Sequence, residues 1–253
     1  MFPVDDLTIV IPTFNERDNV TRLIGDINSV LLVLPELSIR LLFIDDSPNN
    51  ATVEVIEIAA VEQSGPRLTI DYVHRREDDR DGLAGAVIYG IRRTATDLVM
   101  VMDGDGQHPP RTIPSMLAAI EPRDMDLVVA SRYCPGGSAE GLSSPVRHVV
   151  SRMSTWVAKG MFPRATRGIT DPMTGFFVVR AQSINLDSLE SAAGFKVLLE
   201  LMVQHPRLGK TQVPLQFAAR HDGVSKGTLT QGWLYLRQLF RLRFTALSIR
   251  ESR

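Results

Sequence analysis

Short apolar runs alternate with segments of helical spacing along the first 131 residues. Five apolar runs predict β-strands: Leu7–Pro12, Arg40–Ile44, Leu68–Val73, Leu98–Met102 and Asp126–Ala130. The segments between them repeat apolar residues every three or four positions and predict helices, the first of which Asn15 or Asp18 is expected to cap. Strands that alternate with helices favour an α/β fold with a parallel sheet covered on both faces.

The pattern becomes less regular after Tyr133. The remaining expected elements are a helix over Pro145–Gly160, a strand over Phe176–Val179, a helix over Phe195–Gln204, a strand over Gln212–Phe217 and a helix from about Gly232. A polar loop at 221–230 precedes the last helix. No repeat and no linker interrupts the chain, which predicts a single domain.

Composition excludes several classes of protein and adds little else. The chain has 28 Lys and Arg against 29 Asp and Glu, and 44% of its residues are hydrophobic. These values exclude collagen, low-complexity disorder and a disulfide scaffold, and a net charge of −1 gives no overall field that would attract nucleic acid. The single cysteine, Cys134, fits a reducing compartment. Neither a signal peptide nor a membrane-spanning apolar stretch is expected.

The strongest chemical signal follows the fourth predicted strand, in the segment Asp103-Gly104-Asp105-Gly106-Gln107. Two carboxylates separated by one glycine can converge on a hard cation, and Gln107 adds a neutral oxygen ligand. Ligands of parallel sheets bind beyond the carboxyl ends of the strands, where this segment and the second acidic pair, Asp45-Asp46, both lie. The alternative is a turn in which Asp103 caps a helix and Asp105 is solvated.

These segments resemble those of the family-2 glycosyltransferases, and most closely the branch of the polyprenol-phosphate (dolichol-phosphate) mannose synthases. The resemblance rests on Ile11–Glu16, Asp45–Pro48, Asp103–Pro110, Ser131–Tyr133, Asp171–Phe177, Gly194–Lys196 and Phe217–Lys226, in this order along nearly the whole chain. It implies the GT-A fold, a Rossmann-like, mostly parallel sheet flanked by helices. Residues 1–231 would form the catalytic domain, and 232–253 an amphipathic interface helix of the same domain.

The resemblance also implies roles for individual residues. The nucleotide sugar is expected at Pro12, Phe14, Glu16, Asp45, Asp46, Asp103 and Gly104. A Mg²⁺ or Mn²⁺ ion is expected at Asp103, Asp105 and Gln107, where the family usually has Asp-Ala-Asp-Leu-Gln. The acceptor phosphate is expected at Arg132, Arg147, Ser151, Arg220 and Lys226. Asp105, Arg132 and Arg220 would act at the reacting groups.

The reaction implied is transfer of a hexose, mannose from GDP-mannose, to a polyprenyl or dolichyl monophosphate with inversion. Because such an acceptor is already anionic, no strong general base is required. Arg offers a planar fork to phosphate oxygens, and Lys a compact charge. Asp171 is open to three readings: a contact to sugar hydroxyls, ordering of the acceptor loop, or an Asx-turn before Pro172. His108 and His221 are expected to shape loops rather than to catalyse.

The C-terminal stretch points to a membrane surface. From Trp233 onward there are five Arg against one Glu, and Leu236, Leu239 and Phe240 follow helical spacing. A basic amphipathic helix with aromatic residues is typical of a membrane-surface element, whereas a core-packed helix with a solvated basic face is the alternative. We therefore expect a protein peripheral to the cytoplasmic face of a membrane, with a membrane-anchoring subunit as a further partner.

Three other functions are considered for this chain. Another nucleotide sugar, such as UDP-glucose or an aminosugar donor, could serve the same acceptor. Asp103-Gly104-Asp105-Gly106 also mimics the nucleophile motif of HAD-type phosphatases, but that motif belongs after the first strand. A non-catalytic nucleotide-sugar-binding subunit is the third, and the intact acidic and basic sets argue against it.

Overall fold

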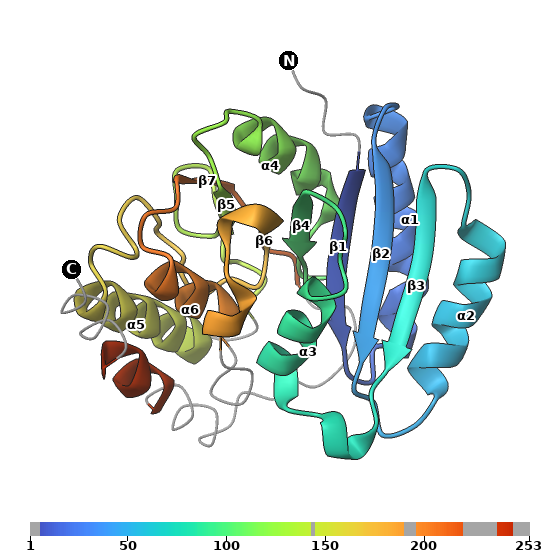
Figure 1. Cartoon of the computed structure of the whole chain (residues 1–253), viewed down its shortest axis with the longest axis horizontal. Helices are drawn as coiled ribbons and strands as arrows, with labels where there is room; N and C mark the ends of the chain where they lie inside the picture. The colour runs from blue at the N-terminus through green and yellow to red at the C-terminus, as the bar shows by residue number, and fades with distance from the viewer. Residues whose placement is uncertain (1–5, 143–144, 190–195, 220–236, 245–253) are drawn as a thin grey trace.

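The computed structural model describes residues 6–142, 145–189, 196–219 and 237–244 (Figure 1). Within these residues seven strands form one sheet. The strands are β1 (Asp6–Thr13), β2 (Ser38–Asp45), β3 (Leu68–His74), β4 (Leu98–Val101), β5 (Leu127–Ser131), β6 (Phe177–Arg180) and β7 (Lys210–Pro214). The α-helices are α1 (Arg17–Val33), α2 (Ala51–Gln63), α3 (Gly82–Ile91), α4 (Ile113–Ile120), α5 (Pro145–Met161) and α6 (Val197–Gln204).

The strand order is β3-β2-β1-β4-β6-β5-β7, and the expected mostly parallel sheet is confirmed. Strands β1, β2, β3 and β4 pair in parallel, as do β5 and β7. The exception is β6, which lies antiparallel between β4 and β5. The carboxyl ends of β1, β2 and β4 therefore share one edge of the sheet, where ligands of such folds bind.

Two apolar cores lie on opposite faces of this sheet. One core packs α1, α2 and α4 against side chains such as Ile9 and Phe43. The other packs α3, α5, α6 and residues 239 and 242 of the C-terminal helical segment against side chains such as Val10 and Ile44. Because successive strand residues point to opposite faces, Ile9 and Val10 belong to different cores. This arrangement is the two-sided cover that the sequence pattern predicts.

Two local predictions are corrected. Neither Asn15 nor Asp18 caps α1: Glu16 occupies the capping position without a side-chain cap. Asn15 instead has a φ of 59°, and its backbone N–H donates to Ser47 Oγ at 2.8 Å, which ties the end of β1 to the loop after β2. The last strand spans Lys210–Pro214 rather than Gln212–Phe217, because its register with β5 begins at Lys210.

Residues 237–244 are helical, with Leu239 and Leu242 buried. The rest of the expected terminal helix lies outside the described residues. No helix in the part of the chain that the structure describes is both long and apolar enough to cross a membrane.

Gly90 of α3 packs closely on the sheet, and it gives a test of this packing. A Cβ at Gly90 would lie 2.4 Å from Val10 Cγ1 and 3.1 Å from Ile44 Cγ1. We expect Gly90→Ala to lower the free energy of unfolding by about 1–3 kcal/mol, since α3 must move away from the sheet. Gly25→Ala on α1 is the matched control, because a Cβ there meets nothing within 4 Å and should stabilise by up to about 1 kcal/mol. Urea denaturation of both variants measures the difference, and equal stabilities would contradict the packing.

Candidate active site

The acidic segment after β4 is held in place by a buried histidine. The backbone N–H of Asp103 donates to His108 Nδ1 at 3.1 Å. The His108 ring is 2% exposed and stacks on Phe176 with ring centroids 5.2 Å apart. This contact gives His108 the loop-shaping role expected from the sequence.

Gln107 fixes the far end of the same segment. Its backbone N–H donates to Asp105 Oδ1 at 3.0 Å, and its side-chain Nε2 donates to the carbonyls of Gly141 and Ala218, both at 3.2 Å. The amide nitrogen thus joins three distant segments. The amide oxygen is the end of Gln107 that suits a cation.

The glycines of this region matter for the room that the missing side chain leaves as well as for their backbone conformation. A Cβ at Gly104 would lie 3.1 Å from Thr13 Cγ2, so the loop packs closely on β1. The positive φ belongs to Gly106, at 77°, so the backbone conformation that favours glycine lies after Asp105 and not between the two carboxylates. A Cβ at Gly175 would lie 2.7 Å from the Asp103 carboxylate, so the absence of a side chain there makes room for that group.

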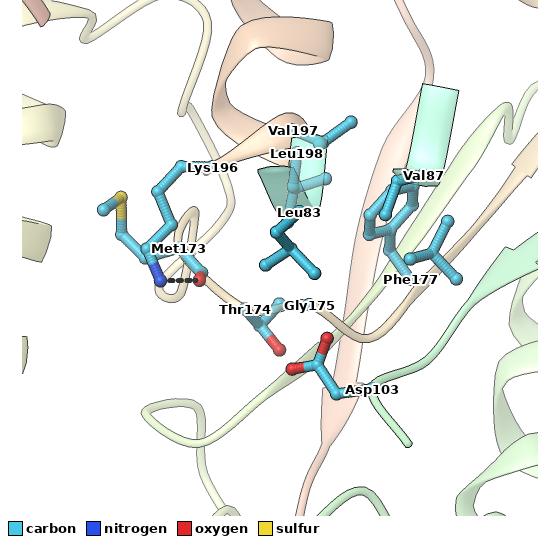
Figure 2. A pocket seen from close by; sticks show the side chains of 11 residues that line it. Leu83, Val87, Asp103, Met173, Thr174, Gly175, Phe177, Lys196, Val197 and Leu198 are labelled. Atoms are coloured by element: carbon cyan, nitrogen blue, oxygen red, sulfur yellow. Dashed lines mark hydrogen bonds between the residues drawn. The ribbon is translucent and has the colours of Figure 1, made fainter. Parts of the chain in front are cut away.

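Beside Asp103 opens a cavity of about 360 Å³, including its mouth (Figure 2). Most of its wall is apolar, and Asp103, Thr174 and Lys196 bring the polar side chains. The lining residues are Leu83, Val87, Val101, Asp103, Met173, Thr174, Gly175, Phe177, Lys196, Val197 and Leu198. Among these, Asp103 carries the only carboxylate and none is a histidine.

Lys196 precedes α6 and stands across this cavity from Asp103 (Figure 2). Its Nζ donates to the Met173 carbonyl at 3.3 Å. Burial and then the charge of Arg132 lower the pKa of Lys196 to about 8, while Asp103 and Asp171 oppose the shift. Lys196 and Arg132 therefore form one cationic region facing the acidic segment.

Arg132 is held by a buried ion pair directly after β5. Its Nε and Nη2 donate to the two carboxylate oxygens of Asp171 at 2.6 and 2.9 Å, and Asp171 is 0% exposed. Burial alone would lower the pKa of Arg132, but the charge and hydrogen bonds of Asp171 outweigh it and hold that pKa above its ordinary value. Asp171 thus orders the side chain of Arg132, which differs from all three readings and is nearest to the second, the ordering of the acceptor loop.

Both carboxylates of the acidic pair after β2 bond to other groups of the protein. Asp45 is 0% exposed and accepts hydrogen bonds from Thr13 Oγ1 at 2.9 Å and Ser47 Oγ at 2.7 Å. His74 Nδ1 lies 2.8 Å from its second oxygen. Asp46 receives the Nε and Nη2 groups of Arg75 at 2.7 and 2.6 Å. The pair therefore links the ends of β1, β2 and β3.

The other residues expected at the nucleotide lie at the end of β1. Pro12 is buried in the strand, opposite Ile44. Phe14 is 42% exposed, and the Glu16 carboxylate accepts a hydrogen bond from Asn19 Nδ2 at 2.7 Å. These residues share the sheet edge with the segment at 103–107.

The structure describes only some of the residues that are expected to bind the acceptor phosphate. Ser151 of α5 pairs with the hydroxyl of Tyr133 at 2.7 Å, and the guanidinium of Arg132 lies 5.2 Å from the Tyr133 ring centroid. Ser151 and Arg132 thus approach the same tyrosine. Arg220 and Lys226 lie outside the described residues, as does the side chain of Arg147.

Sequence reasoning missed two residues. Lys196 was noted only as the last residue of the motif Gly194–Lys196 and was given no role. A lysine at the start of a predicted helix, within a motif of the site, could have indicated one. Arg75 carries no signal: it is one of two arginines after β3, and only the fold shows that it is 4% exposed and paired with Asp46 and Asp81.

Residues 8–185 match the sequence family described as Glycosyl transferase family 2. The chain is 30% identical over 236 residues to a dolichol-phosphate mannosyltransferase of Pyrococcus furiosus, covering 93% of this chain and 63% of that one. It therefore spans less than two thirds of the length of that relative. It is also 32% identical to an undecaprenyl-phosphate mannosyltransferase of Micrococcus luteus, over 86% of this chain and 85% of that one.

Solved structures share the fold at lower identity. Glucosyl-3-phosphoglycerate synthase from Mycobacterium tuberculosis, in complex with Mn²⁺, UDP-glucose and phosphoglyceric acid, superposes with a TM-score of 0.67 at 18% identity. The match covers 96% of this chain and 79% of that one. Mannosyl-3-phosphoglycerate synthase from Rubrobacter xylanophilus gives a TM-score of 0.64 at 17% identity, over 95% of this chain and 78% of that one. The expected GT-A architecture is confirmed.

The lowered pKa of Lys196 predicts how stability depends on pH. The pKa is about 8 in the folded chain and 10.5 in the unfolded one, so the unfolded state binds more protons between these values. The free energy of unfolding should therefore rise with pH across this window through Lys196, and Lys196→Met should remove that rise. Denaturant titrations of the two proteins from pH 7 to 10 give the difference. Parallel pH profiles would contradict the burial of a charged Lys196.

Proposed function

Since the chain belongs to glycosyl transferase family 2, we propose that it transfers mannose from GDP-mannose to the phosphate of a polyprenyl monophosphate, with inversion at the anomeric carbon. The relatives named mannosyltransferases of dolichol and undecaprenyl phosphate support the sugar and the acceptor class. Residues 1–231 would form the catalytic domain, with 232–253 as its interface helix.

One observation carries the proposal: the cavity beside Asp103 offers a cation where a hydroxyl acceptor would need a base. Asp103 is the only carboxylate among its described lining residues, none of which is a histidine, and Lys196 lines the same cavity with its Nζ at the Met173 carbonyl. Transfer to a hydroxyl needs a group that removes a proton, whereas a phosphate acceptor already carries the attacking negative charge. Lys196 together with Arg132 suits such an acceptor.

The acidic segment fits a divalent cation. No cluster of three or more His, Cys, Asp or Glu side chains that could hold a metal alone occurs among the described residues. Two carboxylates with one amide oxygen are instead typical of a site that Mg²⁺ or Mn²⁺ shares with substrate phosphates. Asp103, Asp105 and Gln107 would hold the ion, and Gly175 leaves room beside Asp103. When bound, the ion would neutralise charge on the departing diphosphate.

The nucleotide would occupy the sheet edge at the ends of β1 and β2. Phe14 is exposed there and can contact a base or ribose, and Pro12, Glu16 and Gly104 shape the same edge. Asp45 and Asp46 are committed to Thr13, Ser47 and Arg75, so we assign to them mainly the positioning of this edge.

In this mechanism the protein supplies position and charge. The lipid phosphate is received by Arg132, Ser151, Arg147, Arg220 and Lys226, and Lys196 steadies the negative charge in the cavity. An oxygen of that phosphate attacks the anomeric carbon as the bond to the diphosphate breaks, and no proton has to be removed. Arg132 enters the reaction already oriented, because Asp171 fixes its guanidinium in advance.

The lipid acceptor also implies where the protein acts. A polyprenyl phosphate stays in a bilayer, so we propose a peripheral location at the cytoplasmic face, where nucleotide sugars are available. A membrane-anchoring subunit remains a proposed partner.

A transfer assay tests the reaction and its metal. Radiolabelled GDP-mannose, UDP-glucose and an aminosugar donor are each incubated with polyprenyl phosphate, with and without EDTA. We expect lipid-linked label from GDP-mannose with Mg²⁺ or Mn²⁺ only, and a loss of at least about 100-fold in Asp105→Ala with unchanged circular dichroism. Transfer that survives EDTA, or an Asp105→Ala variant with full activity, would contradict the ion assignment.

Arg220 tests the acceptor assignment separately. We expect Arg220→Ala to raise the KM for lipid phosphate by roughly tenfold or more and to leave the KM for the nucleotide sugar nearly unchanged, since one charge-assisted contact to phosphate is lost. Arg207→Ala, an exposed arginine in the loop between α6 and β7, is the matched control and should change neither constant. Equal increases in both KM values would show that Arg220 does not bind the acceptor.

A further inference from the structure

Helix α6 carries a charge inside the apolar core. Glu200 is the one charged residue of α6, and it is 2% exposed. The other residues of the helix are apolar except Gln204 at its end, and the helix is buried along nearly its whole length. A carboxylate that is removed from water is costly unless other groups compensate its charge. The partners of Glu200 therefore show what holds this charge in the core, about one turn after Lys196.

Two partners of Glu200 come from the C-terminal helical segment, residues 237–244 (Figure 1). Arg241 Nη2 donates to Glu200 Oε1 at 2.9 Å, and Gln238 Nε2 donates to Oε2 at 3.4 Å. Gln238 is 0% exposed, so its amide group lies wholly inside the protein. Gln238 and Arg241 are three positions apart and share one face of the helical segment. We call Glu200, Gln238 and Arg241 the Glu200 link.

The Glu200 link reaches the backbone of Lys196. Gln238 Nε2 also donates to the Lys196 carbonyl at 3.3 Å, and the two hydrogens of its amide nitrogen account for both bonds. The same carbonyl accepts the backbone N–H of Glu200 at 3.3 Å, which begins α6. At the far end of the side chain, Lys196 Nζ donates to the Met173 carbonyl at 3.3 Å. The link therefore fixes the point from which the Lys196 side chain enters the cavity.

Gln238 is a costly residue for a position in the core. Its Oε1 is buried and has no hydrogen-bond partner among the residues that the structure describes. An apolar side chain of similar length would fill the same space without leaving a polar atom unpaired. A buried polar group that lowers stability calls for another explanation. The bond from Gln238 to the Lys196 carbonyl supplies one.

We propose that the three residues of the Glu200 link are positioning residues, which hold the backbone of Lys196 so that its ammonium group stays in the cavity beside Asp103. The C-terminal helical segment then serves the reaction site as well as the proposed interface. This inference rests on the proposed function for the reaction that Lys196 assists. The positioning itself is a property of the chain and can be measured without substrate.

The pKa of Lys196 reports the position of its side chain. The chain has four lysines, so lysine labelled at Cε gives a simple NMR spectrum, and Lys196→Met identifies the signal of this residue. Burial and then the charge of Arg132 lower this pKa to about 8, while Asp103 and Asp171 oppose the shift. Gln238→Met keeps the length of the side chain and removes the amide. It should let Lys196 move toward water and raise its pKa toward 10.5.

Further variants show whether the link is responsible. Glu200→Leu breaks the link at its other end and should raise the same pKa. Arg241→Lys keeps a positive donor for Glu200 and should leave the pKa near 8. Arg243→Met is the matched control, because this arginine of the same segment is exposed.

Two outcomes of the titration would overturn the proposal. One is a Lys196 that titrates near 8 in folded Gln238→Met and in folded Glu200→Leu. The other is a loss of the folded circular dichroism spectrum in both variants, since the link would then be required by the whole fold rather than by one side chain.

Kinetics separate this inference from the proposed function. With GDP-mannose and polyprenyl phosphate, Gln238→Met should lower kcat by roughly tenfold or more and leave the KM for the nucleotide sugar unchanged, whereas Arg243→Met should match the wild type. A wild type that transfers no sugar, together with a raised Lys196 pKa in Gln238→Met, would refute the function and leave the positioning intact. Full kcat in Gln238→Met beside an active wild type would overturn the positioning role.

Discussion

The buried ion pair between Arg132 and Asp171 is the interaction on which the cationic side of the site depends. Taking both charges out of water is costly, and the bidentate geometry at 2.6 and 2.9 Å offsets that cost. Asp171 in the loop before β6 thereby fixes a side chain at the end of β5. The charge of Arg132 in turn contributes to the lowered pKa of Lys196, so the two cations form one electrostatic unit.

The acidic residues divide into two groups by the partners they have. Asp46 is neutralised by the bidentate Arg75, and Asp45 is surrounded by hydroxyls and His74. The segment at 103–107 is shaped by other means, through the His108 ring and the backbone N–H of Gln107. The two carboxylates of this segment follow β4 directly, at the edge of the sheet where ligands of such folds bind, which suits the ion that we propose for Asp103 and Asp105. The partners of Asp45 and Asp46 within the protein suit a positioning role for that pair.

The parts of the fold that depend on short-range periodicity were predictable, and those that depend on long-range partners were not. The first five strands follow from runs such as Leu7–Pro12, because a buried parallel strand must be apolar on both faces. The direction of β6 was not predicted, since it is fixed by β4 and β5 on either side. The cap at Glu16 was missed because a contact from Asn15 to Ser47, distant in sequence, sets the start of α1.

The same limit applies to the site. The acidic segment was visible because its residues are contiguous, but the roles of Asp171 and Arg75 depend on partners about 30 to 40 positions away. For α5, the pattern predicts a helix with an apolar side and cannot say whether that side faces the core. Only the packing of Ala158 shows that the side of the helix with Val149, Met153 and Trp156 faces outward.

The cavity beside Asp103 limits how a polyprenyl acceptor can bind. Its volume of about 360 Å³ includes the open mouth, so the cavity cannot enclose a long prenyl tail together with the reacting groups. Under the proposed function the tail therefore stays outside the protein, and its apolar surface must be covered by something else. Under that function a bilayer would cover it, and Ser151 and Arg132, which both approach Tyr133, would receive the phosphate at the bilayer surface.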